Sequence, residues 1–525
     1  MNRTGKSVFS RSAPIVCGVS LVALAGAGWL DSTGARTAIS ALAAAGLIWS
    51  LVQILREIDF TAPKLLNATA RQLAWIRILV CLTALIYTAM ENLPLFAHQP
   101  PEMRNNYKFW YLLNHLPGAT AVLDSPSLLG ALQWTTALFL LLALVGFQTR
   151  MALCLGAVGF FFTQAVPRHY TYFYHSGLVP VYLLLLLPWT PCAAAWSVDR
   201  LLNRSKAQPN PQSVGLGIFA AYAVMATVYL MSGLSKLRDS GWAWFSGENI
   251  EQKLVRDALE PIFLNYDWKA TLWLVQHHAP DYVFAFIGVF GLVAELGYVA
   301  VLFSRKAQLL LPIMAFAVHL GILVFQHILF LDLLLLQLVF LDVDRVAIFW
   351  GQRVRSNIGP SRPPNVTSKP AMPVSDISIG SLALVVAMLL FAWVWRVEYY
   401  PISSWHMYAN PEKKGPVYYV KIAARLEDGR TIDIPLADCS PAVIPNIRFF
   451  LLNAFRRSGR NPTIDQFFAG YVQRRNRDLA FGSPITSLDL QRRRWNYVTD
   501  PNDPRFGWAV DVYPYDATSK PSLGR

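Results

Sequence analysis

Long apolar runs separated by short polar segments dominate the chain between residues 14 and 397. A helix that crosses a bilayer needs about 20 consecutive apolar residues. Runs of about that length predict eleven spanning helices, over residues 14–30, 37–55, 73–95, 130–147, 151–166, 177–196, 214–235, 282–303, 308–325, 327–342 and 380–397.

Two of these assignments have an alternative. The ninth and tenth spans share one run, from Leu309 to Leu341, which barely holds two short spans, so a re-entrant hairpin is the other interpretation. The first span follows Arg3, Lys6 and Arg11 and also fits a signal anchor or a cleaved signal peptide.

The pattern changes after Arg396, where charged residues become dense and no further span follows. Alternating residues over 417–422 and 431–434, joined by Asp428-Gly429, predict a β-hairpin. We therefore predict an all-α polytopic membrane bundle with a small C-terminal extracytoplasmic α+β domain. Its parts are an N-terminal helix pair (1–60), a transmembrane domain (61–345), a proline-rich cytoplasmic linker (346–379), a last transmembrane helix (380–397) and a soluble domain (398–525).

Composition agrees with a membrane protein. Of the 525 residues, 54% are hydrophobic and 15% charged, whereas soluble domains have about 25% charged residues. The excess of 46 Lys and Arg over 32 Asp and Glu gives a formal charge of +14. A chain this apolar is not a typical nucleic-acid-binding module, so the lipid bilayer is the predicted partner.

The basic residues predict an orientation, because cytoplasmic loops carry more Lys and Arg than external ones. With the N-terminus inside, inside loops carry 17 such residues and outside loops carry 9. The prediction is a multi-pass protein of the plasma (inner) membrane, with a cytoplasmic N-terminus and an external C-terminal domain.

All nine histidines then fall outside or in the outer half of the membrane, which favours an outward-facing polar cavity. Their spacing does not match that of zinc ligands, so no metal site is predicted. The histidines are His98, His115, His169, His175, His277, His278, His319, His327 and His406.

Ionisable residues inside spans usually face the bundle interior or a cavity. Those in this chain are Arg77, Glu91, Glu295, His319 and Asp332. We interpret Arg77 and Glu91 as snorkelling or interhelically paired groups. Glu295 lies in the middle of its span, so either an interhelical partner or a functional role is expected.

Lys236 directly follows the seventh span, within Ser232-Gly-Leu-Ser-Lys236-Leu, and Trp242 and Trp244 follow. Removal from water would disfavour the charged form and leave a free amine, which acts as a base. The other interpretation is an anchoring lysine that reaches the interface over a tryptophan belt.

Short motifs between about residues 65 and 440 resemble one known family. They are Trp75-Ile-Arg77-Ile, Ser232 to Lys236 with Trp242 to Gly247, Glu295, Phe316-Ala-Val-His319-Leu and Ser404-Trp405-His406-Met407-Tyr408. On these residues the chain is similar to bacterial HTTM proteins, which are relatives of the vitamin K-dependent gamma-glutamyl carboxylase. The resemblance implies a cavity for a reduced quinone of the vitamin K or menaquinone type.

The resemblance also implies roles for individual residues. Lys236 would be the base that takes a proton from the reduced quinone, and His319 and His175 would orient the substrate or move protons. The residues expected to contact the quinone and exclude water are Trp242, Trp244, Glu295, Trp405 and Tyr408.

The match departs from the family where the carboxylase has an Asn-Asn-His group before a Gly-Leu-Leu helix. This chain has His169-Tyr-Thr-Tyr-Phe-Tyr-His175-Ser-Gly177 there, with the histidines at other offsets. Quinone-level redox chemistry without glutamate carboxylation therefore stays open. So does a non-catalytic membrane scaffold or maturation partner whose C-terminal domain holds a secreted protein or peptide client. A transporter is disfavoured because no inverted repeat is found.

Overall fold

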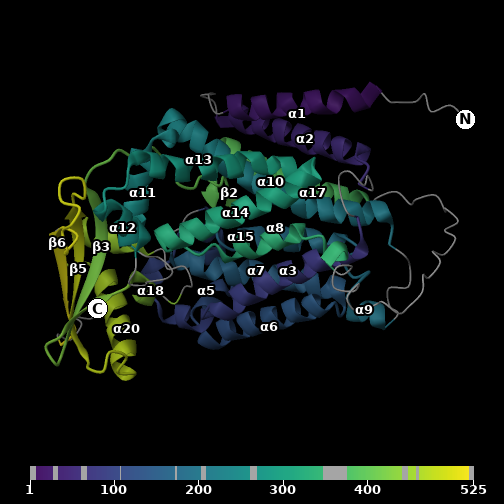
Figure 1. Cartoon of the computed structure of the whole chain (residues 1–525). Coiled ribbons are helices and arrows are strands. Elements are labelled where there is room, and N and C mark those ends of the chain that lie inside the picture. The colour runs from purple at the N-terminus through teal and green to yellow at the C-terminus, as the bar shows by residue number, and fades with distance from the viewer. Residues whose placement is uncertain are drawn as a thin grey trace, which may run out of the picture.

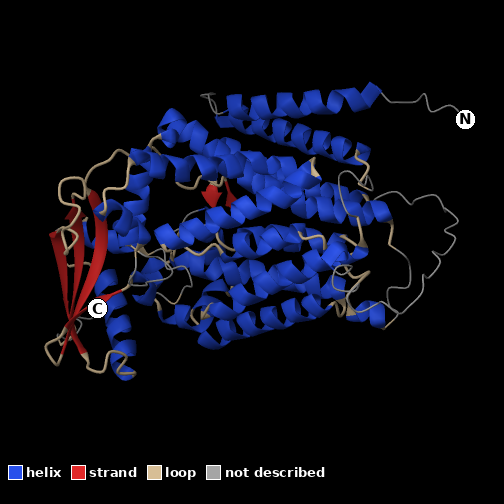
Figure 2. Cartoon of the chain, in the orientation of Figure 1, coloured by secondary structure: helices blue, strands red, loops and turns tan. Residues whose placement is uncertain are grey.

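The protein is a long helical bundle with a small β-sheet at one end (Figures 1 and 2). The computed structural model describes residues 8–27, 33–60, 68–106, 108–171, 174–202, 209–260, 269–346, 375–439, 441, 447–456 and 460–518. Most of the predicted linker, 346–379, lies outside these residues.

Helices make up most of the described chain. The α-helices are α1 (Val8–Ala27), α2 (Thr33–Glu57), α3 (Ala70–Met90), α4 (Lys108–His115), α5 (Ala119–Leu123), α6 (Pro126–Val145), α7 (Thr149–Tyr170), α8 (Leu178–Leu186), α9 (Val198–Leu201), α10 (Pro211–Ser240), α11 (Gly247–Leu259), α12 (Ala270–Gln276), α13 (Asp281–Gly297), α14 (Arg305–Gln326), α15 (Leu331–Leu335), α17 (Asp376–Trp395), α18 (Leu436–Cys439), α19 (Arg448–Leu451) and α20 (Pro462–Arg477). The 3-10 helices are η1 (Leu93–His98), η2 (Pro101–Met103), η3 (Leu187–Trp189), η4 (Gly241–Phe245), η5 (Tyr298–Leu302), η6 (Leu336–Phe340) and η7 (Leu452–Phe455).

Seven described segments are long and apolar enough to cross a membrane. They are Ala70–His98, Pro126–Val145, Thr149–Tyr170, Pro211–Phe245, Asp281–Leu302, Arg305–Gln326 and Asp376–Trp395. These seven coincide with predicted spans, so the prediction of a polytopic membrane bundle is confirmed to that extent and the count of eleven is not. The first two predicted spans fall on helices α1 and α2.

Two predicted spans contain only short apolar helices. The run predicted over 177–196 forms an apolar helix only over Leu178–Trp189, with Gly177 in the left-handed conformation before it. The run from Leu309 to Leu341 holds one full span, α14, which ends where His327 turns left-handed at φ 59°. The apolar segment after it, Leu331–Phe340, is a pair of single turns.

Helix α10 is the central element of the bundle. In its most apolar window 89% of the residues are buried, against 28% for the span at α13 and 22% for α14. Small residues permit close packing: a Cβ on Gly215 would lie 2.2 Å from the Phe60 carbonyl oxygen. Helices α13 and α14 therefore belong to the lipid-facing flank.

Arg77 on α3 is fully buried. Its guanidinium donates to the carbonyl oxygens of Cys192, at 3.0 Å, and Trp196, at 2.5 Å. It also donates to the Leu144 carbonyl of α6 at 3.4 Å. Arg77 therefore ties α3 to α6 and to the segment before α9, which agrees with the predicted interhelical pairing.

The C-terminal region contains an antiparallel sheet in the order β4-β3-β5-β6. Strand β3 (Val417–Leu426) pairs with β4 (Thr431–Ile434), which confirms the predicted hairpin, and Gly429 supplies its turn at φ 87°. Strands β5 (Ile485–Trp495) and β6 (Trp508–Asp516) complete the sheet, and α20 lies beside it (Figure 2). A separate small hairpin pairs β1 (Glu398–Tyr399) with β2 (Ile402–Ser403).

The two ends of the bundle differ. Figure 1 shows α5, α11 and α12 at the end that carries the sheet, and α9 at the opposite end. Helices α5, α11 and α12 fall in loops predicted to lie outside the membrane, and α9 falls in a loop predicted to lie inside. Their positions at opposite ends of the bundle agree with this predicted alternation of the loops.

Candidate functional site

A mostly apolar cavity of about 210 Å³ lies between α10, α11, α13 and α14, near the end that carries the sheet. Its apolar walls include Trp244, Ile287, Phe290 and Phe325. The charged or hydrogen-bonding side chains on its lining are Lys236, Lys253, Glu295, His319, Gln326 and Tyr408. An apolar cavity with a few convergent polar groups is the usual form of a small-molecule site.

Lys236 and Glu295 form an ion pair in this cavity. Lys236 Nζ lies 2.7 and 2.8 Å from the two Glu295 carboxylate oxygens and 2.9 Å from Ser232 Oγ. Their side chains are 7% and 12% exposed. The three contacts account for the three N–H donors of an ammonium. The interhelical partner that was one of the two expectations for Glu295 is therefore Lys236.

Gly233 brings the two charges together. A Cβ at this position would lie 2.8 Å from Leu296 Cδ2 and 3.2 Å from Glu295 Cβ. Only a residue without a side chain lets α10 approach α13 this closely. The Ser-Gly-Leu-Ser-Lys motif thus combines a close helix contact with the lysine one turn later.

His319 faces the same cavity from α14 and is 4% exposed. Its Nε2 lies 2.8 Å from the Tyr229 hydroxyl of α10. Its Nδ1 has no hydrogen-bond partner among the described residues. One ring nitrogen is therefore held by Tyr229, and the other is buried without a partner among the described residues.

Trp244 forms a wall beside two lysines. Its indole N–H donates to the Gly288 carbonyl at 3.1 Å. Lys236 Nζ lies 5.3 Å and Lys253 Nζ 6.0 Å from its ring centroid, within the range of a cation–π contact.

Lys253 is a lining residue that the sequence analysis did not single out. It donates to Asn249 Oδ1 at 3.0 Å and to the Asn410 carbonyl, and burial lowers its pKa against the opposing effect of Glu412. The only signal in the sequence is the four-residue spacing of Asn249 and Lys253, which places them on one face of α11.

Tyr408 and Met407 line the cavity from the segment that follows the β1–β2 hairpin. Asp239, at the end of α10, fastens this segment, because its carboxylate lies 2.6 Å from His406 Nδ1 and 2.7 Å from Arg396 Nη2. Tyr408 has a left-handed backbone (φ 57°), which is uncommon for a residue with a side chain and requires such fixation.

Three residues expected at the site lie elsewhere. Trp242 is 88% exposed and stacks on Phe245, at 5.6 Å between ring centroids. Trp405 is fully buried and packs on His175 at 5.2 Å. None of these three lines the cavity.

His175 belongs to a separate polar cluster around Glu398. The Glu398 carboxylate lies 3.2 Å from His175 Nε2 and accepts hydrogen bonds from the Ser404 hydroxyl, at 2.5 Å, and the His406 amide, at 3.0 Å. Burial acts to raise the pKa of Glu398, but His175 and these hydrogen bonds lower it to about 2. The cluster fixes the hairpin segment to the α7–α8 turn.

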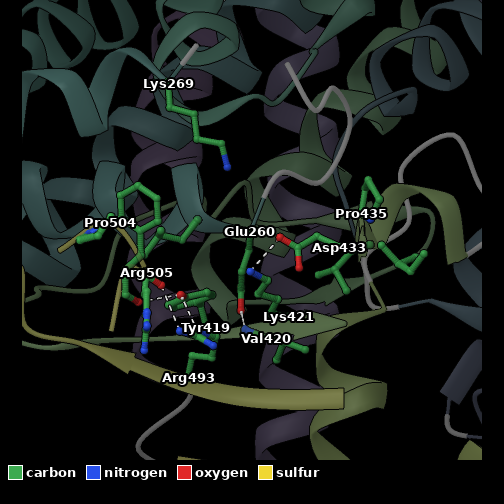
Figure 3. A pocket seen from close by; sticks show the side chains of 14 residues that line it. Glu260, Lys269, Tyr419, Val420, Lys421, Asp433, Pro435, Arg493, Pro504 and Arg505 are labelled. Atoms are coloured by element: carbon green, nitrogen blue, oxygen red, sulfur yellow. Dashed lines mark hydrogen bonds and ion pairs between the residues drawn. The ribbon is translucent and has the colours of Figure 1, made fainter. Parts of the chain in front are cut away.

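A larger cavity of about 670 Å³ lies between the sheet and the end of α11 (Figure 3). Several of its charges are paired: Lys421 with Asp433 at 2.8 Å, and Glu260 with Arg448 at 3.0 Å. Burial raises the pKa of Glu260 to about 7 despite Arg448. Since these charges hold strands and helices together, we interpret this polar cavity as part of the domain interface.

The chain matches no protein-family model, no curated protein and no solved structure among those compared with it. Within the described ranges no three metal-ligating side chains gather in one place.

Proposed function

We propose that this protein is an HTTM-type integral membrane protein whose cavity binds the ring of a reduced quinone and accepts a proton from it, as in a carboxylase-like or oxygenase-like enzyme. The observation that supports the proposal is the convergence of Lys236, Glu295 and His319 on one apolar cavity. These residues come from three helices and are separated by up to 83 positions in sequence.

The size of the cavity favours a ring head group with an external tail. Its 210 Å³ is less than the roughly 300–1,000 Å³ that encloses a whole drug-sized ligand. The unpartnered His319 Nδ1 and the apolar walls fit an aromatic ring that carries polar oxygens.

Access from the bilayer fits the same ligand class. Phe286 on α13 and Ala317 on α14 line the cavity and are exposed on the lipid-facing flank, Phe286 by 67%. A hydrophobic tail between these helices would remain in the membrane while the ring occupies the cavity.

The residues then have distinct roles. Glu295 accepts the proton at a carboxylate oxygen, and the Lys236 ammonium neutralises the negative charge left in the cavity. Trp244 and Tyr408 exclude water, which strengthens both interactions. A reduced quinone, when bound, would react with dioxygen: one oxygen atom would enter the quinone as its epoxide and the other would leave as water.

The test uses full-length protein in lipid nanodiscs with reduced menaquinone, and follows formation of the quinone epoxide. We expect Lys236→Ala and Glu295→Gln each to lower the rate of epoxide formation by at least about a hundredfold. This is the usual effect of removing one group that stabilises charge in the transition state. Lys306→Ala, an exposed lysine at the start of α14, is the matched control and keeps the rate. Epoxide formation that persists unchanged in Lys236→Ala would overturn the proposal.

A second variant tests ligand binding without relying on activity. Gly291 lines the cavity, and a Cβ there would meet nothing within 4 Å. Gly291→Leu should therefore fill the cavity with little change in folding and abolish quenching of tryptophan fluorescence by a quinone. Quenching equal to that of the unaltered protein would place the quinone elsewhere.

A second function has its own observation, the outer strand of the sheet. Strand β6 is an edge strand, and Trp508, Val510 and Val512 expose 55%, 42% and 50% of their surface. An exposed apolar edge fits an extended peptide, as a scaffold for a secreted client needs. Crosslinking from this strand should capture one defined client, and Val510→Lys with Val512→Lys should abolish capture while Lys236→Ala has no effect.

A further inference from the structure

The environment of His319 indicates what the ligand must offer. A chain of hydrogen bonds leads from this histidine into the bundle, through Tyr229, Gln337 and Tyr298. All four side chains are buried. The donor and the acceptor in each of these hydrogen bonds can be assigned, beginning at Gln337.

Gln337 fixes the direction. Its Nε2 lies 2.7 Å from the Leu333 carbonyl, which only accepts, so the amide nitrogen occupies that position. Its Oε1 accepts from the Tyr298 hydroxyl at 2.5 Å. The second N–H of the amide therefore points to the Tyr229 oxygen, 2.8 Å away.

The hydrogen bond from Gln337 in turn determines how Tyr229 bonds to His319. Because its oxygen accepts from Gln337, its own hydroxyl hydrogen is free to point at His319 Nε2, 2.8 Å away. In the reverse arrangement, a protonated His319 Nε2 would donate to the Tyr229 oxygen. The Tyr229 hydroxyl hydrogen and the Nδ1 lone pair would then both be buried without a partner, whereas the first arrangement leaves only the Nδ1–H unpaired, so the reverse arrangement is less stable. A neutral His319 consequently carries its proton on Nδ1.

Resting on the function proposed above, we infer that His319 presents an Nδ1–H donor to the cavity, and that the ligand must offer a hydrogen-bond acceptor there, such as an oxygen atom on the quinone ring. Lys236 cannot take this role without losing a partner, because its three donors are already used by Ser232 and Glu295. Tyr229, Gln337 and Tyr298 are positioning residues, since they act through His319.

The tautomer is measured directly, without any ligand. In protein labelled with ¹⁵N-histidine, the nitrogen shifts of His319, assigned by their loss in His319→Gln, distinguish a protonated Nδ1 from a protonated Nε2. We expect the proton on Nδ1 in the unaltered protein. Tyr229→Phe removes the hydroxyl group that donates to His319 Nε2 and keeps this nitrogen unprotonated. We therefore expect this variant to give a mixture of the two tautomers.

Tyr222→Phe is the matched control. Tyr222 lies two turns earlier on α10, is buried, and stacks on Phe340 outside the chain of bonds. It should leave the His319 signals unchanged. A protonated Nε2 in the unaltered protein, or an equal effect of the two tyrosine variants, would overturn the inference.

Binding of two probes tests the ligand class. Menadione has carbonyl acceptors and 2-methylnaphthalene has none, although both have the same carbon skeleton. The unaltered protein should prefer menadione by about tenfold, the effect of one hydrogen bond, and Tyr229→Phe should lose that preference. Equal affinities in the unaltered protein contradict the inferred donor. If Nδ1 is protonated but neither ring binds, the donor is supported and the quinone function is wrong.

Discussion

Lys236 and Glu295 show how a buried residue acquires its character from its neighbour. An isolated lysine at this depth would favour its neutral form, whereas the carboxylate at 2.7 Å compensates the ammonium charge. Ser232 takes the remaining donor. The same pair that we assign to proton transfer therefore also stabilises the contact between α10 and α13.

This gives a prediction for single and double variants. Lys236→Met or Glu295→Leu alone leaves one buried charge without its partner and should lower the free energy of unfolding by about 3–5 kcal/mol. The double variant removes both charges and should be more stable than either single one. Thermal unfolding of the purified proteins measures this, and single variants as stable as the unaltered protein would contradict the ion pair.

Glu398 provides a pH dependence outside the membrane spans. Its pKa in the folded protein is about 2, below the ordinary value near 4.5. Its contribution to stability is therefore complete above about pH 4.5 and is lost as the pH falls toward 2. Glu398→Gln should lower the unfolding temperature at pH 6, and the difference from the unaltered protein should shrink below pH 4.5.

Glu427→Gln serves as the control for this series, because Glu427 is exposed in the β3–β4 turn region. It should change the unfolding temperature little at any pH. A difference for Glu398→Gln that stays constant from pH 6 to pH 3 would show that the carboxylate is not stabilised by the cluster around His175.

At the scale of elements, glycine placement sets the spacing of the helices around the cavity. A methyl group on Gly233 would contact Leu296 and Glu295, while one on Gly291 would meet nothing within 4 Å. Both positions are helical, so the intrinsic gain from glycine to alanine, about 0.5–1 kcal/mol, is the same.

We therefore expect opposite effects of the same substitution. Gly233→Ala should separate α10 from α13 and lower the unfolding temperature, whereas Gly291→Ala should keep or raise it. The contribution of helix propensity is the same in both variants, so the difference between their unfolding temperatures reports the α10–α13 contact alone. Equal changes in both would show that the α10–α13 contact is not close at Gly233.

At the scale of the whole molecule, the two ends of the bundle allow a direct test of orientation. Val510 in the sheet is 42% exposed and Leu201 in α9 is 81% exposed, at opposite ends. If the C-terminal domain is external, Val510→Cys should react with a membrane-impermeant maleimide in intact cells and Leu201→Cys only after permeabilisation. The reverse pattern would place the proposed site toward the cytoplasm.

The sequence by itself predicted the membrane bundle, because spans are recognised by apolar length alone, and it predicted the β3–β4 hairpin from alternation and the Asp-Gly turn. It also singled out Lys236, Glu295 and His319, since ionisable groups are rare in apolar runs. In 177–196 and 327–342 the described helices are shorter than predicted, because Gly177 and His327 start new segments.

Only the tertiary structure decided which of these residues meet. A helix surrounded by lipid and other apolar helices has no polar face that reveals its neighbours, so the pattern along α10 does not show that Lys236 faces Glu295. For the same reason the sequence grouped His175, Trp242 and Trp405 with the site, whereas packing turns Trp242 outward and places the other two around Glu398. The partner of a buried charge is set by the close approach of two helices, which here depends on the missing side chain of Gly233.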